Sequence, residues 1–230
     1  MTSRTDASIR APIRAVVPVA LREVVETLAP RFERETGRRI EAVHMLNPEV
    51  PAHVATGAGW DIAFTNPPYV ARMVAAGHAE TAGARPFARI PLALGARGEH
   101  TTERTEAGIA GVLRQARRIA YTGDGTSGGT FLALLARLGL ADALADRLSA
   151  LEGGGPMRAV LRGEADLAAL PLTNVAPVPG MSATAVCPED WDVHVDIDLC
   201  ANEDGRVLAD WLALPVVRRD LAGMGAESRL

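Results

Sequence analysis

The chain has 230 residues, of which 48% are hydrophobic, 23% charged and 4% aromatic. This composition is ordinary for a soluble globular protein, and the length suffices for one large domain or two lobes of about 100 residues each. The formal net charge is −4, so the composition does not indicate the positively charged surface that a nucleic-acid partner requires. None of the 24 basic residues is a lysine, which excludes lysine-based covalent chemistry.

No apolar run approaches the length of a membrane span, so we expect no insertion into a membrane. Residues 1–12 are polar and are expected to form a loose segment. The first apolar run, at 15–21, contains a proline and does not resemble a signal sequence. We therefore expect a cytoplasmic protein, or a periplasmic or extracellular one if a leader has been removed. Cys187 and Cys200 are expected to be small buried hydrophobic residues.

Strands and helices alternate along the first part of the chain. Apolar spacing predicts, in order, strand 13–18, helix 20–35, strand 39–44, helix 52–56, a buried strand within 60–70 and helix 70–76. This alternation predicts right-handed βαβ units on a parallel sheet.

A long strand at 84–98 breaks this alternation and indicates a crossover into a second lobe. The elements expected after it are helix 106–115, strand 119–122, helix 130–138, helix 141–151, helix 156–162, strand 166–171, surface loop 173–180, strand 192–202 and helix 205–220. Strand 192–202 returns to the first lobe, so two connections form a hinge. The predicted fold is α/β with two lobes, 13–88 plus 199–230 and 89–198, each with a parallel or mixed sheet and helices on both faces.

A glycine-rich turn at 123–129 carries the strongest functional signal. It lies between a strand and a helix, and such a turn directs free backbone N–H groups and the positive end of the helix dipole at one point. Thr126, Ser127 and Thr130 add hydroxyl donors, and no basic residue lies in the turn. The turn therefore predicts a site for a small oxyanion or carboxylate, without a metal or a cofactor.

Three other interpretations of this turn are open. Gly123, Gly125 and Gly128 match the dinucleotide fingerprint G-x-G-x-x-G, but the segment that follows is predicted to be helical rather than a second strand ending in an acidic residue. A phosphate-binding P-loop requires a lysine, which this chain lacks. The turn also has a simpler interpretation as a tight connection without a ligand.

Ligands of open parallel sheets bind beyond the carboxyl ends of the strands. Four turns at such ends are expected to line a cleft between the lobes, at 18–21, 46–49, 65–69 and 121–130. Arg89, in the crossover, is a candidate for a bidentate contact with a carboxylate, or for a structural ion pair.

Four segments together resemble the type II periplasmic binding proteins, nearest the molybdate-binding branch. They are VPVALREVVETLAPRFERETG, WDIAFTNPPYV, AYTGDGTSGGTFLALLARLG and RAVLRGEADLAALPLTNVAPVPG. The resemblance covers about 13–225 and implies that two lobes close on a tetrahedral oxyanion held by amides and hydroxyls at helix N-termini. Where molybdate binders carry serines, this chain has Ala20 in the first turn and Leu46, Asn47 and Pro48 in the second. These departures argue against molybdate itself, because a buried dianion needs most of its oxygens satisfied.

The segment GEADLAALPLTNVAPVPG is closer to a side branch that contains aconitate isomerase, a cofactor-free enzyme. The alternative function is therefore a 1,3 proton shift on a small polycarboxylate, which needs a base and donors for the developing charge. Tyr121, Asp124 and His44 are the candidate catalytic residues. Each also has a structural interpretation, as a packed strand-end tyrosine, a turn-forming aspartate and a surface histidine.

The candidate ligand-binding residues lie in these turns, in the crossover and at the start of the loop 173–180. They are Ala20, Leu21, Asn47, Thr65, Asn66, Arg89, Thr126, Ser127, Gly128, Gly129, Thr130, Thr173 and Asn174. The expected partner is a small anion, and a transporter permease is a partner only if a leader was removed. No histidine spacing suggests a metal site.

Overall fold

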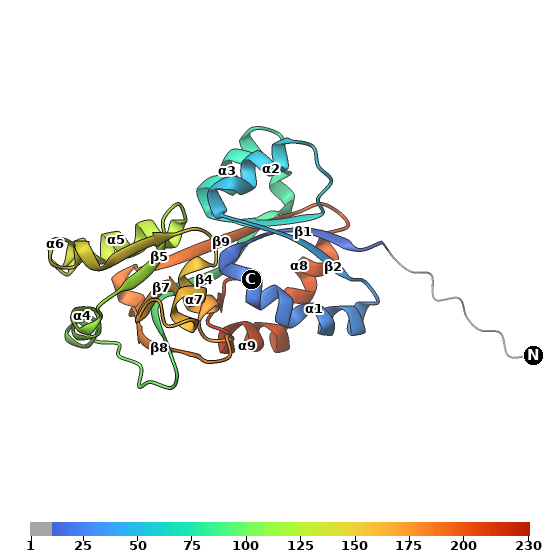
Figure 1. Cartoon of the computed structure of the whole chain (residues 1–230). Coiled ribbons are helices and arrows are strands. Elements are labelled where there is room, and N and C mark those ends of the chain that lie inside the picture. Colours follow the sequence, from blue (N-terminus) through green and yellow to red (C-terminus); the bar gives the residue numbers. More distant parts are fainter. Residues whose placement is uncertain (1–10) are drawn as a thin grey trace, which may run out of the picture.

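The computed structural model describes residues 11–230, so the segment 1–10 of the expected loose N-terminus lies outside the described residues (Figure 1). Within 11–230 the strands form one mixed ten-stranded sheet in the order β2-β1-β3-β9-β4-β7-β5-β6, with β8 and β10 also paired to β4. The strands are β1 (Ile13–Pro18), β2 (Ile40–Met45), β3 (Ile62–Thr65), β4 (Ala84–Arg97), β5 (Ile119–Thr122), β6 (Leu148–Leu151), β7 (Leu167–Pro171), β8 (Met181–Val186), β9 (His194–Ala201) and β10 (Glu227–Ser228).

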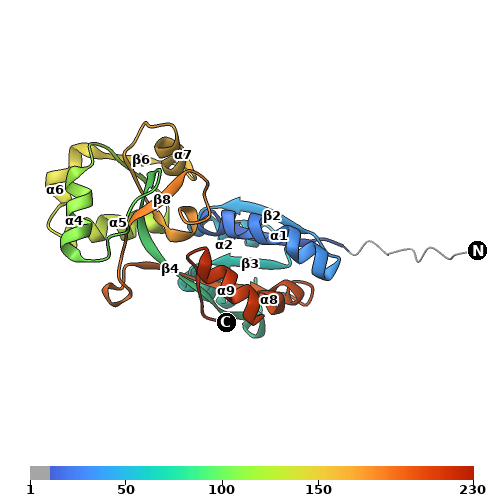
Figure 2. The same ribbon diagram turned by 90° about the horizontal axis from the view of Figure 1, so that it is seen from below.

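Helices cover both faces of this curled sheet. They are α1 (Arg22–Thr36), α2 (Val50–Ala55), α3 (Pro67–Ala75), α4 (Glu106–Gln115), α5 (Thr126–Arg137), α6 (Ala141–Leu144), α7 (Gly155–Leu161), α8 (Arg206–Leu212) and α9 (Pro215–Gly223). Figure 2 shows two groups of helices at opposite ends of the molecule, with β4 between them.

Strand β4 belongs to two sections of the sheet. Its residues 84–91 pair with β9 and β10, whereas its residues 92–97 pair with β7 and β8. We call β2, β1, β3, β9, β10 and 84–91 the first section, and β6, β5, β7, β8 and 92–97 the second section. The sequence predicted separate sheets, but the structure has one curled sheet because a single strand is shared.

The core of the first section follows from the alternation of β1. Ile13, Ala15 and Val17 pack with the apolar stripe of α1 and with α8 and α9, whereas Val16 faces the opposite side and packs with α2 and α3. Figure 1 shows these two helix groups on opposite faces of the sheet. Helix α1 ends at Gly37, whose φ of 70° is a left-handed conformation that glycine adopts without strain.

The core of the second section is also two-sided. Helices α4, α5 and α6 bury apolar side chains against one face, including Ile109, Phe131 and Leu144. Helix α7 and the segment that follows β7 cover the other face, where Val160 and Val175 are buried. Cys187 and Cys200 are buried, and burial raises the pKa of both thiols to about 12.

Within 11–230 no single helix has the length and hydropathy of a membrane span. One pair of helical segments, α5 and residues 141–147, has together the length and composition of a membrane span, but the pair is bent by 119°.

Several predicted elements differ from the structure. The expected helix 130–138 begins at Thr126, so residues 126–129 of the predicted turn are helical, and the expected helix 70–76 begins at Pro67. The expected helix 141–151 ends early, and 148–151 form β6, because this segment pairs along the edge strand β5 and tertiary pairing overrides its helical spacing. The expected helix 205–220 is broken into α8 and α9 at Pro215, which opens the second helix at the position that tolerates a proline. The predicted surface loop 173–180 begins with buried residues rather than exposed ones.

Strand pairing also bears on the predicted lobe boundaries. The partners of β4 change between Pro91 and Leu92, and the chain returns between Val186 and His194. The range 89–198 expected for the second lobe therefore includes 89–91 and 194–198, which pair in the first section. The division into lobes itself stays a prediction.

Candidate functional site

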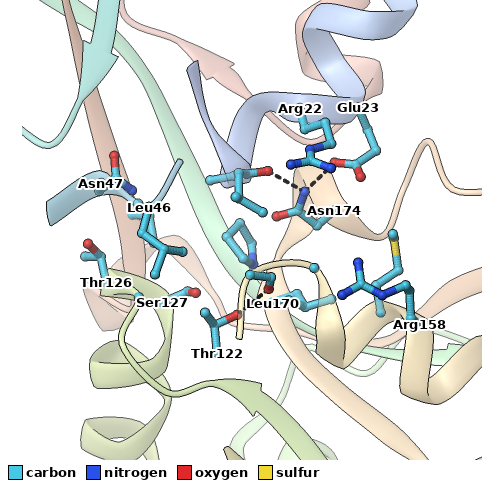
Figure 3. A pocket seen from close by; sticks show the side chains of 18 residues that line it. Arg22, Glu23, Leu46, Asn47, Thr122, Thr126, Ser127, Arg158, Leu170 and Asn174 are labelled. Atoms are coloured by element: carbon cyan, nitrogen blue, oxygen red, sulfur yellow. Dashed lines mark hydrogen bonds between the residues drawn. The ribbon is translucent and has the colours of Figure 1, made fainter. Parts of the chain in front are cut away.

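A cavity of about 50 Å³ lies where the two sections meet, at the carboxyl ends of β1, β2, β5, β6 and β7. One water needs roughly 10–15 Å³ of such space, so the cavity accommodates a ligand of only a few heavy atoms. Figure 3 shows the residues that line it. They are Val19, Ala20, Arg22, Glu23, Leu46, Asn47, Thr122, Gly125, Thr126, Ser127, Gly153, Gly154, Met157, Arg158, Leu170, Pro171, Asn174 and Val195.

The N-terminus of α5 supplies backbone donors to this cavity. Gly125 precedes the helix and its carbonyl accepts from the N–H of Gly128 at 3.0 Å, whereas the N–H groups of Thr126 and Ser127 have no partner within the described residues. These two groups carry the positive end of the helix dipole. They therefore present donors to a ligand in the cavity.

Glycine at 128 allows α5 to begin directly against the end of β5. A Cβ at this position would lie 1.9 Å from the carbonyl oxygen of Thr122, so only glycine fits there without a backbone shift. Gly129 differs, because a Cβ at that position would meet nothing within 4 Å. The two neighbouring glycines therefore have different structural roles.

Charged side chains line the side of the cavity opposite α5. Arg22 and Glu23 lie in the first turn of α1, and Arg158 lies on α7 (Figure 3). The Nε of Arg22 is buried and has no hydrogen-bond partner among the described residues. Burial raises the pKa of Glu23, although Asn174 donates to its carboxylate. Arg22 and Arg158 give this cavity positive charge that the glycine-rich turn lacks.

The two sections also touch each other directly around the cavity. The Thr126 hydroxyl donates to Oδ1 of Asn66 at 2.7 Å, which links the N-termini of α5 and α3. On the other side, the Thr173 hydroxyl donates to the carbonyl of Ala20 at 2.5 Å. Nδ2 of Asn174 donates to the carbonyl of Val19 at 2.9 Å and to Oε2 of Glu23 at 2.5 Å. These contacts hold the two sections together over the cavity.

Five of the predicted ligand-binding residues line the cavity. They are Ala20, Asn47, Thr126, Ser127 and Asn174. Asn47 is 6% exposed, and its Oδ1 has no hydrogen-bond partner among the described residues. Asn66 and Thr173 do not line the cavity but bind residues that do.

The remaining predicted ligand-binding residues lie elsewhere. Leu21 is fully buried in the core of the first section, and Thr65 is fully buried with its hydroxyl donating to the carbonyl of Asn47. Arg89 forms a bidentate ion pair with Asp196, at 2.9 and 3.0 Å, so its guanidinium already has a partner.

Three predicted positions lie farther along α5. Gly128 packs on Thr122, Gly129 is exposed, and the Thr130 hydroxyl donates to the carbonyl of Thr126 at 3.1 Å. None of the three is a lining residue.

The candidate catalytic residues are also outside the lining. The Tyr121 ring packs on Phe131 at a centroid distance of 5.7 Å, and Asp124 is exposed. His44 lies 3.7 Å from Glu26, and burial and Arg22 lower its pKa. The cavity thus brings together none of the acids and bases on which the isomerase hypothesis depended.

Sequence reasoning missed several lining residues. Arg22 and Glu23 directly follow the predicted turn 18–21, so extending that turn into the first helical turn would have found them. Gly153, Gly154 and Arg158 follow β6, which the sequence predicted as helix. Because that strand end was not recognised, the triple-glycine turn after it was not counted among the turns that line the cleft.

Comparisons with known proteins agree with this architecture. A family described as bacterial extracellular solute-binding protein matches residues 13–217. The periplasmic molybdate-binding protein of Azotobacter vinelandii superposes with a TM-score of 0.79 at 19% identity, covering 93% of this chain and 98% of that one. The sulfate-binding protein SubI of Mycobacterium tuberculosis gives 0.69 at 13% identity, with coverages of 96% and 88%. PEB3 of Campylobacter jejuni gives 0.67 at 12% identity, with coverages of 93% and 98%.

A comparison with curated protein sequences found no significant match. At these identities the solved structures establish the fold alone, which is that of the two-lobed periplasmic binding proteins. The family match covers most of the chain. The protein therefore belongs to the bacterial extracellular solute-binding protein family.

Proposed function

We propose that this protein binds one small anionic solute, a tetrahedral oxyanion or a small carboxylate, in the cavity between the two sections. The observation that carries the proposal is the convergence of a helix N-terminus and two arginines on one small space. The N–H groups of Thr126 and Ser127 have no acceptor among the described residues, and Arg22 and Arg158 line the same cavity. An anion in the cavity would accept hydrogen bonds from these groups.

The size of the cavity limits the ligand. About 50 Å³ suits an oxyanion with one central atom or a short carboxylate, and is small for a tricarboxylate. So small a cavity favours a binding protein over an enzyme acting on a polycarboxylate. Hydroxyl donors are fewer than the molybdate-binding resemblance implies, since Ala20 and Leu46 line the cavity where serines would be expected. Arg22 and Arg158 would compensate for them with charge-assisted hydrogen bonds.

Solute release requires the sections to separate, and we propose that they act as two hinged lobes. The hinge would lie where β4 changes partners at Pro91 and Leu92 and where the chain returns between Val186 and His194. Two connections at adjacent positions favour a bending motion over a sliding one. The contacts from Thr126, Thr173 and Asn174 would then break on opening and re-form on closure.

Solute-binding proteins of this family are extracellular or periplasmic and act with ABC transporters. We propose the same setting for this chain, with a transporter permease as its partner and with no cofactor.

The test is a thermal-shift screen of the full chain followed by calorimetric titration. Molybdate, sulfate, phosphate and small mono- and dicarboxylates are the probes, because a ligand that binds only the folded form raises its melting temperature. The Ser127→Ala variant should weaken the ligand that shifts the melt. Thr130→Val is the matched control, since its hydroxyl lies in the same helix but bonds to the carbonyl of Thr126. Equal affinity of the wild type and Ser127→Ala would count against this cavity.

A further inference from the structure

Glu23 places a negative charge in a cavity whose other charged residues are arginines. It lines the cavity together with Arg22 and Arg158. Its Oε2 accepts from Asn174, whereas its Oε1 has no hydrogen-bond partner outside its own residue among those described. Figure 3 shows its carboxylate beside the Asn174 amide, at the Arg22 side of the cavity. One carboxylate oxygen is therefore left to meet the ligand.

Glu23 supplies the acceptor on this side of the cavity. Asn47 lies across from it, but its Oδ1 is buried, so a ligand in the cavity does not reach that oxygen. The Glu23 carboxylate thus shares this small space with the donors of α5, Arg22 and Arg158. A ligand made only of acceptors would satisfy the donors but would leave the free Glu23 oxygen unpaired, which costs free energy.

We propose that Glu23 selects for an anion that carries a hydrogen-bond donor of its own, such as the hydroxyl of hydrogenphosphate, and against fully deprotonated oxyanions of the same size. The inference rests on the proposed anion-binding function. The α5 N-terminus, Arg22 and Arg158 hold the anionic oxygens, and Glu23 accepts the ligand's proton. When the ligand has no proton, its negatively charged oxygen faces the negatively charged carboxylate of Glu23. The repulsion between these two charges weakens binding of such a ligand.

Phosphate and sulfate form a matched pair of probes. At mildly alkaline pH both are tetrahedral dianions of similar size, and only phosphate retains a proton. Calorimetric titration of the full chain should give an affinity for phosphate at least about 10-fold tighter than for sulfate, the ratio expected when one polar partner is left unpaired.

The variant Glu23→Gln removes the charge and keeps the shape. It should bind sulfate more tightly and phosphate more weakly than the wild type does, so that the ratio falls by about 10-fold or more. Glu26→Gln is the control, because Glu26 lies on the same helix, is exposed and does not line the cavity. It should leave the ratio unchanged.

The outcomes separate the two proposals. If the wild type binds sulfate or molybdate as tightly as phosphate, the role of Glu23 is refuted while the anion-binding function stands. The role of Glu23 is also refuted if the ratio of phosphate to sulfate affinity is the same in Glu23→Gln as in the wild type. If no anion or carboxylate binds at all, the proposed function fails and the inference fails with it. The wild-type ratio alone decides the question if the variant does not fold.

Discussion

The Thr126 hydroxyl donates to Oδ1 of Asn66 at 2.7 Å, and these residues begin helices that belong to different sections of the sheet. Asn66 is 7% exposed, and its Nδ2 donates to the carbonyl of Asp196 at 2.7 Å. Both ends of the Asn66 amide are therefore engaged. The pair ties the N-terminus of α5 to strand β9 beside the proposed hinge.

Replacing Thr126 by valine should weaken ligand binding. The change keeps the side-chain shape but leaves Oδ1 of Asn66 without its donor in the closed form, at a cost of about 1–2 kcal/mol, or about 5- to 30-fold in affinity. Titration calorimetry measures the affinity, and small-angle X-ray scattering should show a larger radius of gyration in the unliganded variant. Thr130→Val should behave as the wild type in both measurements, and matching behaviour of the two variants would contradict the role of Thr126 in closure.

Alanine at two adjacent glycines should have opposite effects. Gly128→Ala forces a Cβ against the carbonyl of Thr122, so we expect a loss of stability of more than about 2 kcal/mol. Gly129→Ala adds a methyl group to an open position in a helix and should stabilise the protein by about 0.5–1 kcal/mol. Urea unfolding of both variants provides the comparison. A similar midpoint for the two would show that α5 does not begin against β5 as described.

Replacing Arg22 by methionine should weaken ligand binding. Arg22 lines the cavity, so Arg22→Met removes positive charge and guanidinium donors from the space that the ligand would occupy. We expect an affinity loss of about 10-fold or more and a weaker dependence of affinity on salt. Arg34→Met is the control, since Arg34 lies on the same helix, is exposed and bonds to the carbonyl of Pro30. Equal losses in both variants would indicate a general effect of net charge.

Glu23 should make the unliganded protein less stable as the pH rises. Burial raises its pKa in the folded state above its ordinary value of 4.5, so the folded protein binds this proton more tightly than the unfolded chain does. Below 4.5 the group is protonated in both states and carries no penalty. The penalty appears as the pH passes through the raised pKa and is complete above it. Glu23→Gln should therefore melt at a higher temperature than the wild type at neutral pH, with the difference vanishing in acid. A constant difference across this range would contradict a buried titrating carboxylate.

The sequence was most informative where local signals were strong. Strands 13–18 and 119–122 and helix 106–115 agree with the structure residue for residue, because alternation and helical spacing there coincide with the final burial pattern. The glycine-rich segment was correctly placed directly after a strand, but α5 begins at Thr126, inside the predicted turn 123–129. Gly128 meets a requirement of the backbone there, whereas Gly129 does not.

The rest depended on contacts that no local pattern encodes. Residues 148–151 have helical spacing but form a strand, because an open sheet edge lies beside them. Thr173 and Asn174 were expected in a surface loop, yet they are buried because they bind the turn after β1. Arg89 was a candidate ligand contact, and only the fold reveals that Asp196 lies opposite it. Such pairings are set by the path of distant strands.

Strand β4 has 14 residues and serves as a common member of both halves of the sheet. If β4 detaches from one half of the sheet, the other half also loses hydrogen-bond partners. Unfolding of one half alone is therefore costly. Heat or urea should therefore unfold the protein in one cooperative transition, even though its shape suggests two units that unfold independently.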